Sequence, residues 1–207
     1  MFITFEGIDG SGKSTQMRLL AERLRTQGRS VVENAEPGGT PIGVQIRRIL
    51  LDARNQELYP TAELLLYFAS RAQAVDELVR PALAEGKIVL SDRWTDSTLV
   101  YQGCGRGLGA DTLRTLDGIA CRGLVPDLTL IVDIDLEASL ARARVRNTES
   151  ESSETRMDEQ SVEFHRQVRD AYHALAAEEP GRIRLVDGSS SVDAIADEIW
   201  KIVGRYV

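Results

Sequence analysis

Short apolar runs alternate along the chain with longer segments in which apolar residues recur every three or four positions. Five runs have the length and content of buried strands, at residues 1–6, 30–35, 88–90, 128–132 and 183–186. Helical spacing marks six longer segments, at residues 13–27, 42–51, 61–85, 136–146, 161–178 and 191–207. Pro81 is expected to kink the third of these helices in its last turn. Strands that alternate with helices in this way predict a parallel sheet covered by helices on both faces.

A glycine-rich loop joins the first predicted strand to the first helix. It fits the pattern G-x-x-x-x-G-K-S, in which backbone amides and the helix N-terminus bind phosphate groups. In this pattern Lys13 bridges phosphates and Ser14 ligates Mg²⁺. The predicted ATP-binding residues are Gly7, Ile8, Asp9, Gly10, Ser11, Gly12, Lys13, Ser14 and Thr15. The loop therefore predicts a phosphoryl-transfer enzyme with the three-layer P-loop NTPase fold, a five-stranded parallel α/β sheet flanked by helices.

Length and composition favour one domain. The chain has 207 residues, 43% of them hydrophobic, which suffices for one substantial core but not for a second large domain. Its 25 basic and 32 acidic residues give a net charge of −7, which argues against a nucleic-acid partner. No apolar run approaches the ~20 residues of a membrane span, and the start lacks a basic leader, so we expect a cytoplasmic protein that is mature from Met1. Cys104 and Cys121 have neither zinc nor disulfide-scaffold spacing and are expected to be reduced thiols.

Charged residues follow directly after the third predicted strand. Asp92 and Arg93 stand where that strand ends, and ligands of parallel sheets bind beyond the carboxyl ends of the strands. Asp92 is placed to hold Mg²⁺ through water, and a helix-capping role is the alternative. Arg93 presents a planar fork that matches a phosphate group, and a surface salt bridge is the alternative.

The phosphate loop contains no cation except Lys13, so transition-state charge must be neutralised from another part of the chain. Residues 147–155 are rich in Ser and Glu and have no apolar periodicity, which predicts a mobile surface segment. We expect a lid at about 142–160 that brings an arginine to the site. The candidates are Arg142, Arg144, Arg146 and Arg156, and a solvated basic helix face is the alternative for each.

Other side chains leave more than one interpretation open. Tyr67 and Arg71 share one helix face, where they form either core packing with a salt bridge or a platform that stacks and hydrogen-bonds a base. The loop Glu36-Pro37-Gly38-Gly39-Thr40, with Arg47 one helix further, is a weak signal alone. His165 and His173 lie two turns apart on a polar helix and are expected to be solvated surface residues.

Several motifs together resemble the thymidylate kinase family, which phosphorylates dTMP to dTDP with ATP and Mg²⁺. They are, in chain order, Phe5-Glu6-Gly7-Ile8-Asp9-Gly10-Ser11-Gly12-Lys13-Ser14-Thr15, Glu36-Pro37-Gly38-Gly39-Thr40, Asp92-Arg93, and Tyr101-Gln102-Gly103 leading to Gly105-Arg106-Gly107. The likeness runs from Phe5 to the final predicted helix. A phosphate loop without arginine is similar to the bacterial subtype, which supplies the catalytic arginine from the lid, here Arg156 or Arg146. The resemblance also implies a homodimer.

The resemblance implies a set of dTMP-binding residues: Asp9, Glu36, Pro37, Arg47, Tyr67, Arg71, Arg93, Ser97, Thr98, Tyr101 and Gln102. Within this set it places Asp9 near the sugar 3′-hydroxyl, Arg93 and Arg47 at the acceptor phosphate, Arg71 at thymine and Tyr67 as the stacking aromatic. The implied catalytic residues are Lys13, Arg93 and Asp9 with the lid arginine, and the implied metal ligands are Ser14 and Asp92. A monophosphate with a second pKa near ~6 is largely ionised at neutral pH, so it needs arginine clamps more than a general base.

Two other functions are compatible with parts of the sequence. A deoxynucleoside kinase would use a glutamate at the end of the second strand, where Glu36 stands, as the base for a hydroxyl acceptor. A nucleotide-dependent switch would use the phosphate loop for slow hydrolysis, but the chain has no Asn-Lys-x-Asp motif for guanine. Phosphorylation of dTMP is therefore the favoured prediction.

Overall fold

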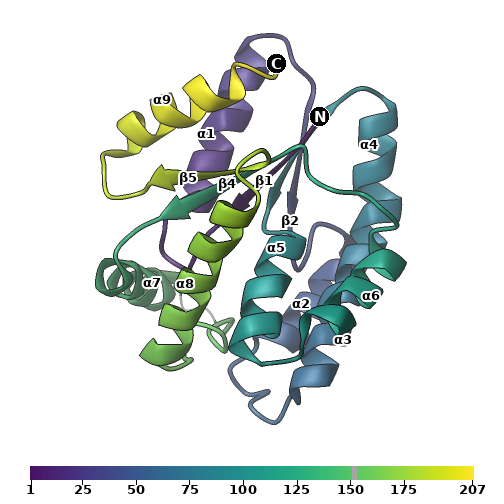
Figure 1. Ribbon diagram of the computed structural model, residues 1–207, viewed down its shortest axis with the longest axis vertical. Coiled ribbons are helices and arrows are strands. Elements are labelled where there is room, and N and C mark those ends of the chain that lie inside the picture. The colour runs from purple at the N-terminus through teal and green to yellow at the C-terminus, as the bar shows by residue number, and fades with distance from the viewer. Residues whose placement is uncertain (151–152) are drawn as a thin grey trace.

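Five parallel strands form the centre of the chain, in the order β2-β3-β1-β4-β5 (Figure 1). The computed structural model describes residues 1–150 and 153–207, without the side chains of residues 149 and 150. The strands are β1 (Phe2–Glu6), β2 (Val31–Ala35), β3 (Ile88–Asp92), β4 (Leu128–Asp133) and β5 (Ile183–Asp187). The predicted five-stranded parallel sheet is confirmed, because all five apolar runs are strands and each pairs in parallel with its neighbours.

The register of the sheet brings the strand ends together at one edge. Phe5 of β1 pairs with Asp92 of β3, and Ala35 of β2 pairs with the same residue from the other side. On the opposite flank of β1, Glu6 pairs with Ile131 of β4. The phosphate loop, the loop after β2 and the residues after β3 therefore leave the sheet side by side.

Helices follow each of the first four strands and close the chain after β5. Their bounds are α1 (Lys13–Thr26), α2 (Pro41–Leu51), α3 (Pro60–Ala74), α4 (Arg80–Ala84), α5 (Thr95–Thr98), α6 (Ala110–Ala120), α7 (Leu136–Ser150), α8 (Val162–Glu178) and α9 (Val192–Val203), with π-helical turns η1 (Val75–Val79) and η2 (Leu99–Gly105). None of the helices within the described residues combines the length and apolar character of a membrane span.

The helices differ from their predictions in four places, one of which is the final helix, predicted over 191–207 but ending at Val203. The segment 61–85 is α3, η1 and α4 in succession, and the irregular turn falls at 75–79 because Pro81 has no N–H for the regular bond to residue 77. The helix predicted to end at residue 146 continues to Ser150, and residues 151–152 of the predicted lid lie outside the described residues. Helices α5 and α6 had no predicted counterpart, although Leu113 and Ala120 of α6 are seven residues apart and both buried.

Two apolar layers enclose the sheet. On one face, α1 and α9 pack against the sheet through residues such as Leu24, Leu130 and Ile199. On the other face, α3, η1, α4 and α6 surround Phe2 and Trp94, and α8 packs with η2 over β4 and β5. Figure 1 shows α1 and α9 together on one side of the sheet and α3 and α6 on the other. The three-layer α/β architecture predicted from the alternation of strands and helices is confirmed.

We expect Leu130→Ala to lower the free energy of unfolding by about 2–5 kcal/mol, because Leu130 is fully buried in the layer between the sheet and α1. Leu185 on the neighbouring strand is 41% exposed, so Leu185→Ala is the matched control, with an expected cost of about 1 kcal/mol or less. Urea denaturation of both variants measures the difference. Equal losses would contradict the layer assignment.

Candidate active site

The phosphate loop forms a cavity of about 410 Å³ at the N-terminus of α1. Gly10 has a positive φ of 83°, and a Cβ added there would lie 2.2 Å from the Ser139 carbonyl oxygen, so the loop requires glycine. Of the predicted ATP-binding residues, the cavity is lined by Gly10, Ser11, Gly12, Lys13, Ser14 and Thr15. Gly7 and Ile8 line neither cavity described here, since Gly7 packs on β4 and the Ile8 side chain is buried. Backbone amides at a helix N-terminus favour phosphate, so this cavity suits a nucleotide donor.

A second cavity, of about 580 Å³, adjoins the first. All of the predicted dTMP-binding residues line it: Asp9, Glu36, Pro37, Arg47, Tyr67, Arg71, Arg93, Ser97, Thr98, Tyr101 and Gln102. The two cavities share Lys13, Ser14 and Arg146. Groups bound in the two cavities would therefore meet beside these three side chains.

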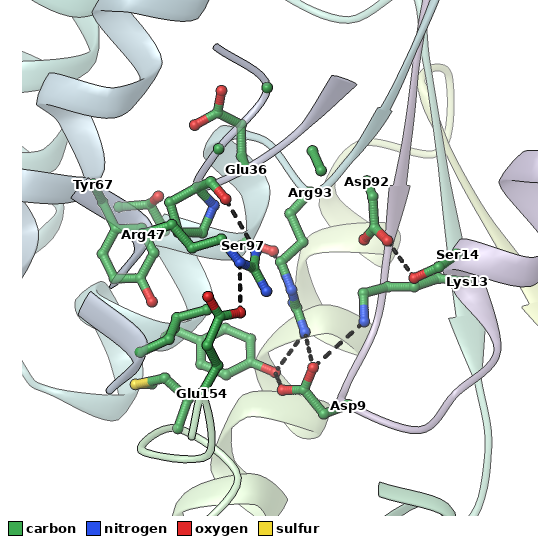
Figure 2. Close-up of a pocket in the computed structure, with 18 of the residues that line it drawn as sticks. Asp9, Lys13, Ser14, Glu36, Arg47, Tyr67, Asp92, Arg93, Ser97 and Glu154 are labelled. Atoms are coloured by element: carbon green, nitrogen blue, oxygen red, sulfur yellow. Dashed lines mark hydrogen bonds and ion pairs between the residues drawn. The ribbon is translucent and has the colours of Figure 1, made fainter. Parts of the chain in front are cut away.

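Asp9 stands between two cations at the boundary of the cavities. Lys13 Nζ lies 3.5 Å from Asp9 Oδ1, and Arg93 Nη2 donates to the same oxygen at 2.9 Å. Figure 2 shows the two side chains reaching Asp9 from different elements, Lys13 from the start of α1 and Arg93 from just after β3. Burial alone would raise the pKa of Asp9, but the charges of Arg93 and Lys13 hold it well below its ordinary value. Asp9 is thus a permanent anion that fixes both cations.

The predicted metal ligands contact each other beside Lys13. The Ser14 hydroxyl donates to Asp92 Oδ2, and both side chains line the larger cavity (Figure 2). No cluster of three or more His, Cys, Asp or Glu side chains suited to a metal occurs within the described part of the chain. A hydroxyl and one carboxylate fit Mg²⁺, which keeps several waters and takes its remaining ligands from substrate phosphates.

Glu36 and Arg47 form the wall of the larger cavity beyond β2. Glu36 Oε2 accepts from Ser70 Oγ at 3.3 Å. Burial raises the pKa of Glu36 to about 7, although the positive charge of Arg71 acts to lower it. Arg47 donates from Nε to Glu154 Oε2 at 2.8 Å and from Nη1 to the Pro37 carbonyl at 3.0 Å. Arg47 is therefore in the cavity, with a carboxylate as its present partner.

Arg71 offers unpaired donors to the same cavity. It is 1% exposed, its Nη2 donates to the Trp94 carbonyl at 3.1 Å, and its Nε and Nη1 have no partner among the described residues. Buried donors without partners are uncommon and fit a ligand that carries acceptor oxygens. Tyr67 lines the cavity from the preceding turn of α3. The sequence alone allows either core packing or base binding for Tyr67 and Arg71. Both side chains line the cavity, where a base could contact them.

The arginines of the predicted lid separate into different environments. Arg156 is 2% exposed, and its Nη1 lies 2.8 Å from Glu63 Oε2 while its Nε donates to the Leu50 carbonyl at 2.5 Å. It lines neither cavity, so the structure does not bring Arg156 to the site. Arg146 lines both cavities, its side chain is 52% exposed, and its Nη2 lies 2.7 Å from Asp158 Oδ2. Arg142 lines only the smaller cavity, and Arg144 lines neither.

The expectation that both histidines are solvated is wrong for His165. This side chain is 1% exposed because α8 turns it inward beside Phe164, and burial lowers its pKa. His173, two turns later, is half-exposed and lies 3.1 Å from Asp133 Oδ2. Both cysteines are free thiols, as expected, with Cys104 exposed and Cys121 buried.

Several residues around the site were not predicted. The larger cavity is also lined by Asn147, Glu154, Met157 and Asp158 of the lid region, and the smaller one by Gly188, Ser190 and Val192 after β5. Gly188, Ser190 and Val192 follow the fifth predicted strand, and ligands of parallel sheets bind beyond the carboxyl ends of the strands, so their place in the sequence was the available signal. Glu6 and Tyr172 lie behind Arg93, where Tyr172 donates to Glu6 Oε2 at 2.8 Å. Their separation of 166 positions left no local signal.

Comparison with known proteins points to one family. The thymidylate kinase family model matches residues 5–199. The chain is 47% identical to a thymidylate kinase of Solidesulfovibrio magneticus over 100% of both chains, and 52% identical to one of Pelobacter propionicus over 96% of this chain and 91% of that protein. The crystal structure of the Ehrlichia chaffeensis thymidylate kinase superposes with a TM-score of 0.79 at 33% identity, covering 99% of this chain and 98% of that one. With two adjoining cavities that suit a nucleotide donor and a monophosphate acceptor, the chain belongs to the thymidylate kinase family, whose activity is the phosphorylation of dTMP.

Proposed function

We propose that the chain transfers the γ-phosphoryl group of ATP to dTMP, with ATP in the phosphate-loop cavity and dTMP in the larger one. The observation that carries the assignment is that Lys13, Ser14 and Arg146 line both cavities. Transfer in line between two bound phosphates depends on positioning and charge neutralisation more than on covalent help from the protein. A shared wall of two cations and a hydroxyl supplies both.

Arg93 and Arg47 hold the acceptor phosphate in this proposal, and Lys13 bridges the donor phosphates. Arg93 is 15% exposed on its side chain and Arg47 is 34% exposed, so both can reach a ligand in the larger cavity. Asp9 keeps Arg93 and Lys13 close together despite their like charges. In addition to holding these two cations, Asp9 contacts the sugar 3′-hydroxyl of dTMP in this proposal.

Thymine lies at the far end of the larger cavity. Tyr67 stacks on the base, the free donors of Arg71 bind a carbonyl oxygen, and Thr98, Tyr101 and Gln102 surround base and sugar. Ser97, Glu36 and Pro37 complete the wall on the side of β2 and β3. The proposed orientation puts the phosphate near Arg93 and the base near Arg71.

Ser14 and Asp92 are the residues that would hold Mg²⁺. When bound, the ion supplies positive charge to the donor phosphates. The hydroxyl of Ser14 already contacts the Asp92 carboxylate, so both ligands face one point beside Lys13. Neither residue needs a different backbone position to take that role.

Arg146 is the lid residue that neutralises the transferred charge in this proposal, in place of Arg156. A residue with this task must lie between donor and acceptor, and Arg146 lines both cavities. Arg156 is instead committed to Glu63 in the interior. The lid at about 142–160 then has one end at the site and the other end anchored to the body of a single domain.

The proposal includes a homodimer and a cytoplasmic location. Apolar side chains remain on the outer surfaces of α2 and α3, with Ile42 at 48%, Ile49 at 47% and Leu65 at 50% exposure, and a second copy would cover them. Both substrates are nucleotides of the cell interior, which supports the location. The net charge of −7 supports small-molecule partners over nucleic acid.

We expect the chain to phosphorylate dTMP in preference to thymidine, because the arginines of the larger cavity need an anionic acceptor. A coupled assay of ADP release with ATP and each acceptor measures this. The buried Glu36, with its raised pKa, could serve as a base for a hydroxyl acceptor, so thymidine is the informative comparison. Turnover of thymidine without turnover of dTMP would assign the cavity to a nucleoside acceptor. Chelation of Mg²⁺ is the accompanying control and should abolish turnover.

We expect Arg146→Ala to lower kcat by about 10³-fold or more with little change in stability, because its side chain is half-exposed and lies at both cavities. Arg156→Ala should instead lower the free energy of unfolding by about 3–5 kcal/mol, since it breaks a buried ion pair, while the folded enzyme retains its turnover. Arg144→Ala is the control from the same helix. A large loss of kcat at Arg156 or Arg144 with native stability would move the role there.

We expect Ile49→Asp to convert a dimer to monomers, because it places a charge on the apolar surface of α2. Light scattering after size exclusion measures the mass. The exposed Ile119 on α6 provides a control in Ile119→Asp, which should leave the mass unchanged. A wild-type chain that is monomeric at micromolar concentration would exclude the proposed dimer.

A further inference from the structure

Arg93 has an unusual backbone and a heavily supported side chain. Its φ of 71° lies in the left-handed region, which non-glycine residues seldom adopt. Its backbone N–H donates to the Phe5 carbonyl at 2.9 Å, and its carbonyl accepts from Ser91 Oγ at 2.7 Å. The surroundings therefore fix this residue in a conformation it would not choose alone.

The guanidinium of Arg93 is held at its two ends by different groups. Nη2 donates to Asp9 at 2.9 Å, while Nη1 donates to Ser97 Oγ at 3.0 Å and to the Tyr172 hydroxyl at 3.4 Å. Asp9 belongs to the phosphate loop, Ser97 to α5 and Tyr172 to α8, and the Tyr101 hydroxyl of η2 also accepts from Nη2 at 3.3 Å. Four elements thus determine where the fork points.

Glu6 connects the backbone and the side chain of this arrangement. Its Oε1 accepts from the Trp94 backbone N–H at 2.7 Å, directly after Arg93. Its Oε2 accepts from Ser97 Oγ at 2.5 Å and from the Tyr172 hydroxyl at 2.8 Å. Burial raises the pKa of Glu6 to about 7, against the lowering effect of the Arg93 charge. In its ionised form the carboxylate only accepts, so the hydroxyl protons then point toward Glu6 and leave oxygen lone pairs for Arg93. The carboxylate therefore gives the two hydroxyls the orientation that Arg93 requires.

Tyr172 does not itself reach a substrate. It is 2% exposed, it packs in the cluster under α8, and it lines neither cavity. Its hydroxyl is nevertheless within hydrogen-bond distance of three groups, Glu6, Ser97 and Arg93. Apolar packing explains why the Tyr172 ring is buried, but it does not explain the hydroxyl. A hydroxyl in a buried polar cluster must be hydrogen-bonded, because an unsatisfied polar group there is costly.

We infer that Tyr172 is a positioning residue that, through its hydroxyl and with Glu6 and Ser97, aims the Arg93 guanidinium at the phosphate of the acceptor nucleotide. The inference rests on the proposed role of Arg93 in the larger cavity. Without the hydroxyl, Nη1 of Arg93 keeps only Ser97 Oγ as an acceptor, while Nη2 keeps Asp9 and the Tyr101 hydroxyl. The fork can then rotate away from the acceptor phosphate while the base site around Arg71 stays unchanged. Tyr172 thus tunes phosphate recognition and leaves base recognition alone.

The test is Tyr172→Phe, which keeps the ring and removes only the hydroxyl. Calorimetric affinities for dTMP and thymidine separate phosphate recognition from base recognition. We expect the variant to bind dTMP about tenfold more weakly, the effect of one hydrogen bond to a charged group, and to bind thymidine as the wild type does. The KM for dTMP should rise and the KM for ATP should stay unchanged.

The control is Val168→Ala, one turn earlier on α8, where a fully buried apolar side chain offers Arg93 no hydrogen bond. It should lower the melting temperature at least as much as Tyr172→Phe and leave the ratio of the two affinities unchanged. In an Arg93→Ala background, Tyr172→Phe should have no further effect on dTMP binding, because the hydroxyl acts through Arg93.

Equal loss of dTMP and thymidine affinity, or unchanged affinity for both, would overturn the inference. If Tyr172→Phe does not fold, Glu6→Gln replaces it, and it must show the same selective loss for dTMP. The amide NH2 group must face either the Trp94 N–H, which is itself a donor, or the two hydroxyls, whose protons it would turn toward Arg93. The binding measurements need no turnover. Absence of dTMP phosphorylation by the wild type would therefore refute the proposed function separately from the role of Tyr172.

Discussion

The contact of one carboxylate with two cations holds the active-site region together. Asp9 leaves the end of β1 in a loop so tight that Gly10 beside it tolerates no side chain, and this places the carboxylate against Lys13 and Arg93. Lys13 and Arg93 repel each other, and the Asp9 carboxylate between them offsets this repulsion. Because the pKa of Asp9 is lowered far below its usual value, that anion persists at every physiological pH. The junction of the two cavities therefore has a fixed geometry before any ligand arrives.

The sheet and its ligand-binding edge could be predicted from the sequence because both depend on local patterns. The three inner strands are almost wholly buried and mainly apolar, and the edge strands β2 and β5 still carry apolar pairs bounded by turn residues, so all five were visible. Parallel pairing then carries every strand end to the same edge, which is why residues as distant as Asp9, Glu36 and Arg93 line one cavity. Chain order and strand direction determine where these positions lie. The resemblance to a known family indicated which of the residues there bind the substrate.

The remaining features depend on tertiary contacts that have no local signature. Arg156 and Arg146 both flank the same polar segment, yet one is drawn into the interior by Glu63 and the other stays at the surface. His165 and His173 stand on the same helix, and only the packing of α8 against η2 decides which one is buried. Helix α6 was missed for a different reason. Its short pattern of Leu113, Leu116 and Ala120 is visible only once Gly109 is recognised as the residue that starts the helix.

The pairing of Arg47 with Glu154 affects how a nucleotide leaves the larger cavity. In the role proposed for Arg47, the acceptor phosphate competes with the Glu154 carboxylate, so the cavity would gain only the difference between two charge pairs. When the phosphorylated nucleotide departs, Glu154 would pair with Arg47 again and leave no bare cation in a partly buried wall. The contact would thus lower the affinity of the cavity for both the acceptor and its product, and a weakly held product is released sooner.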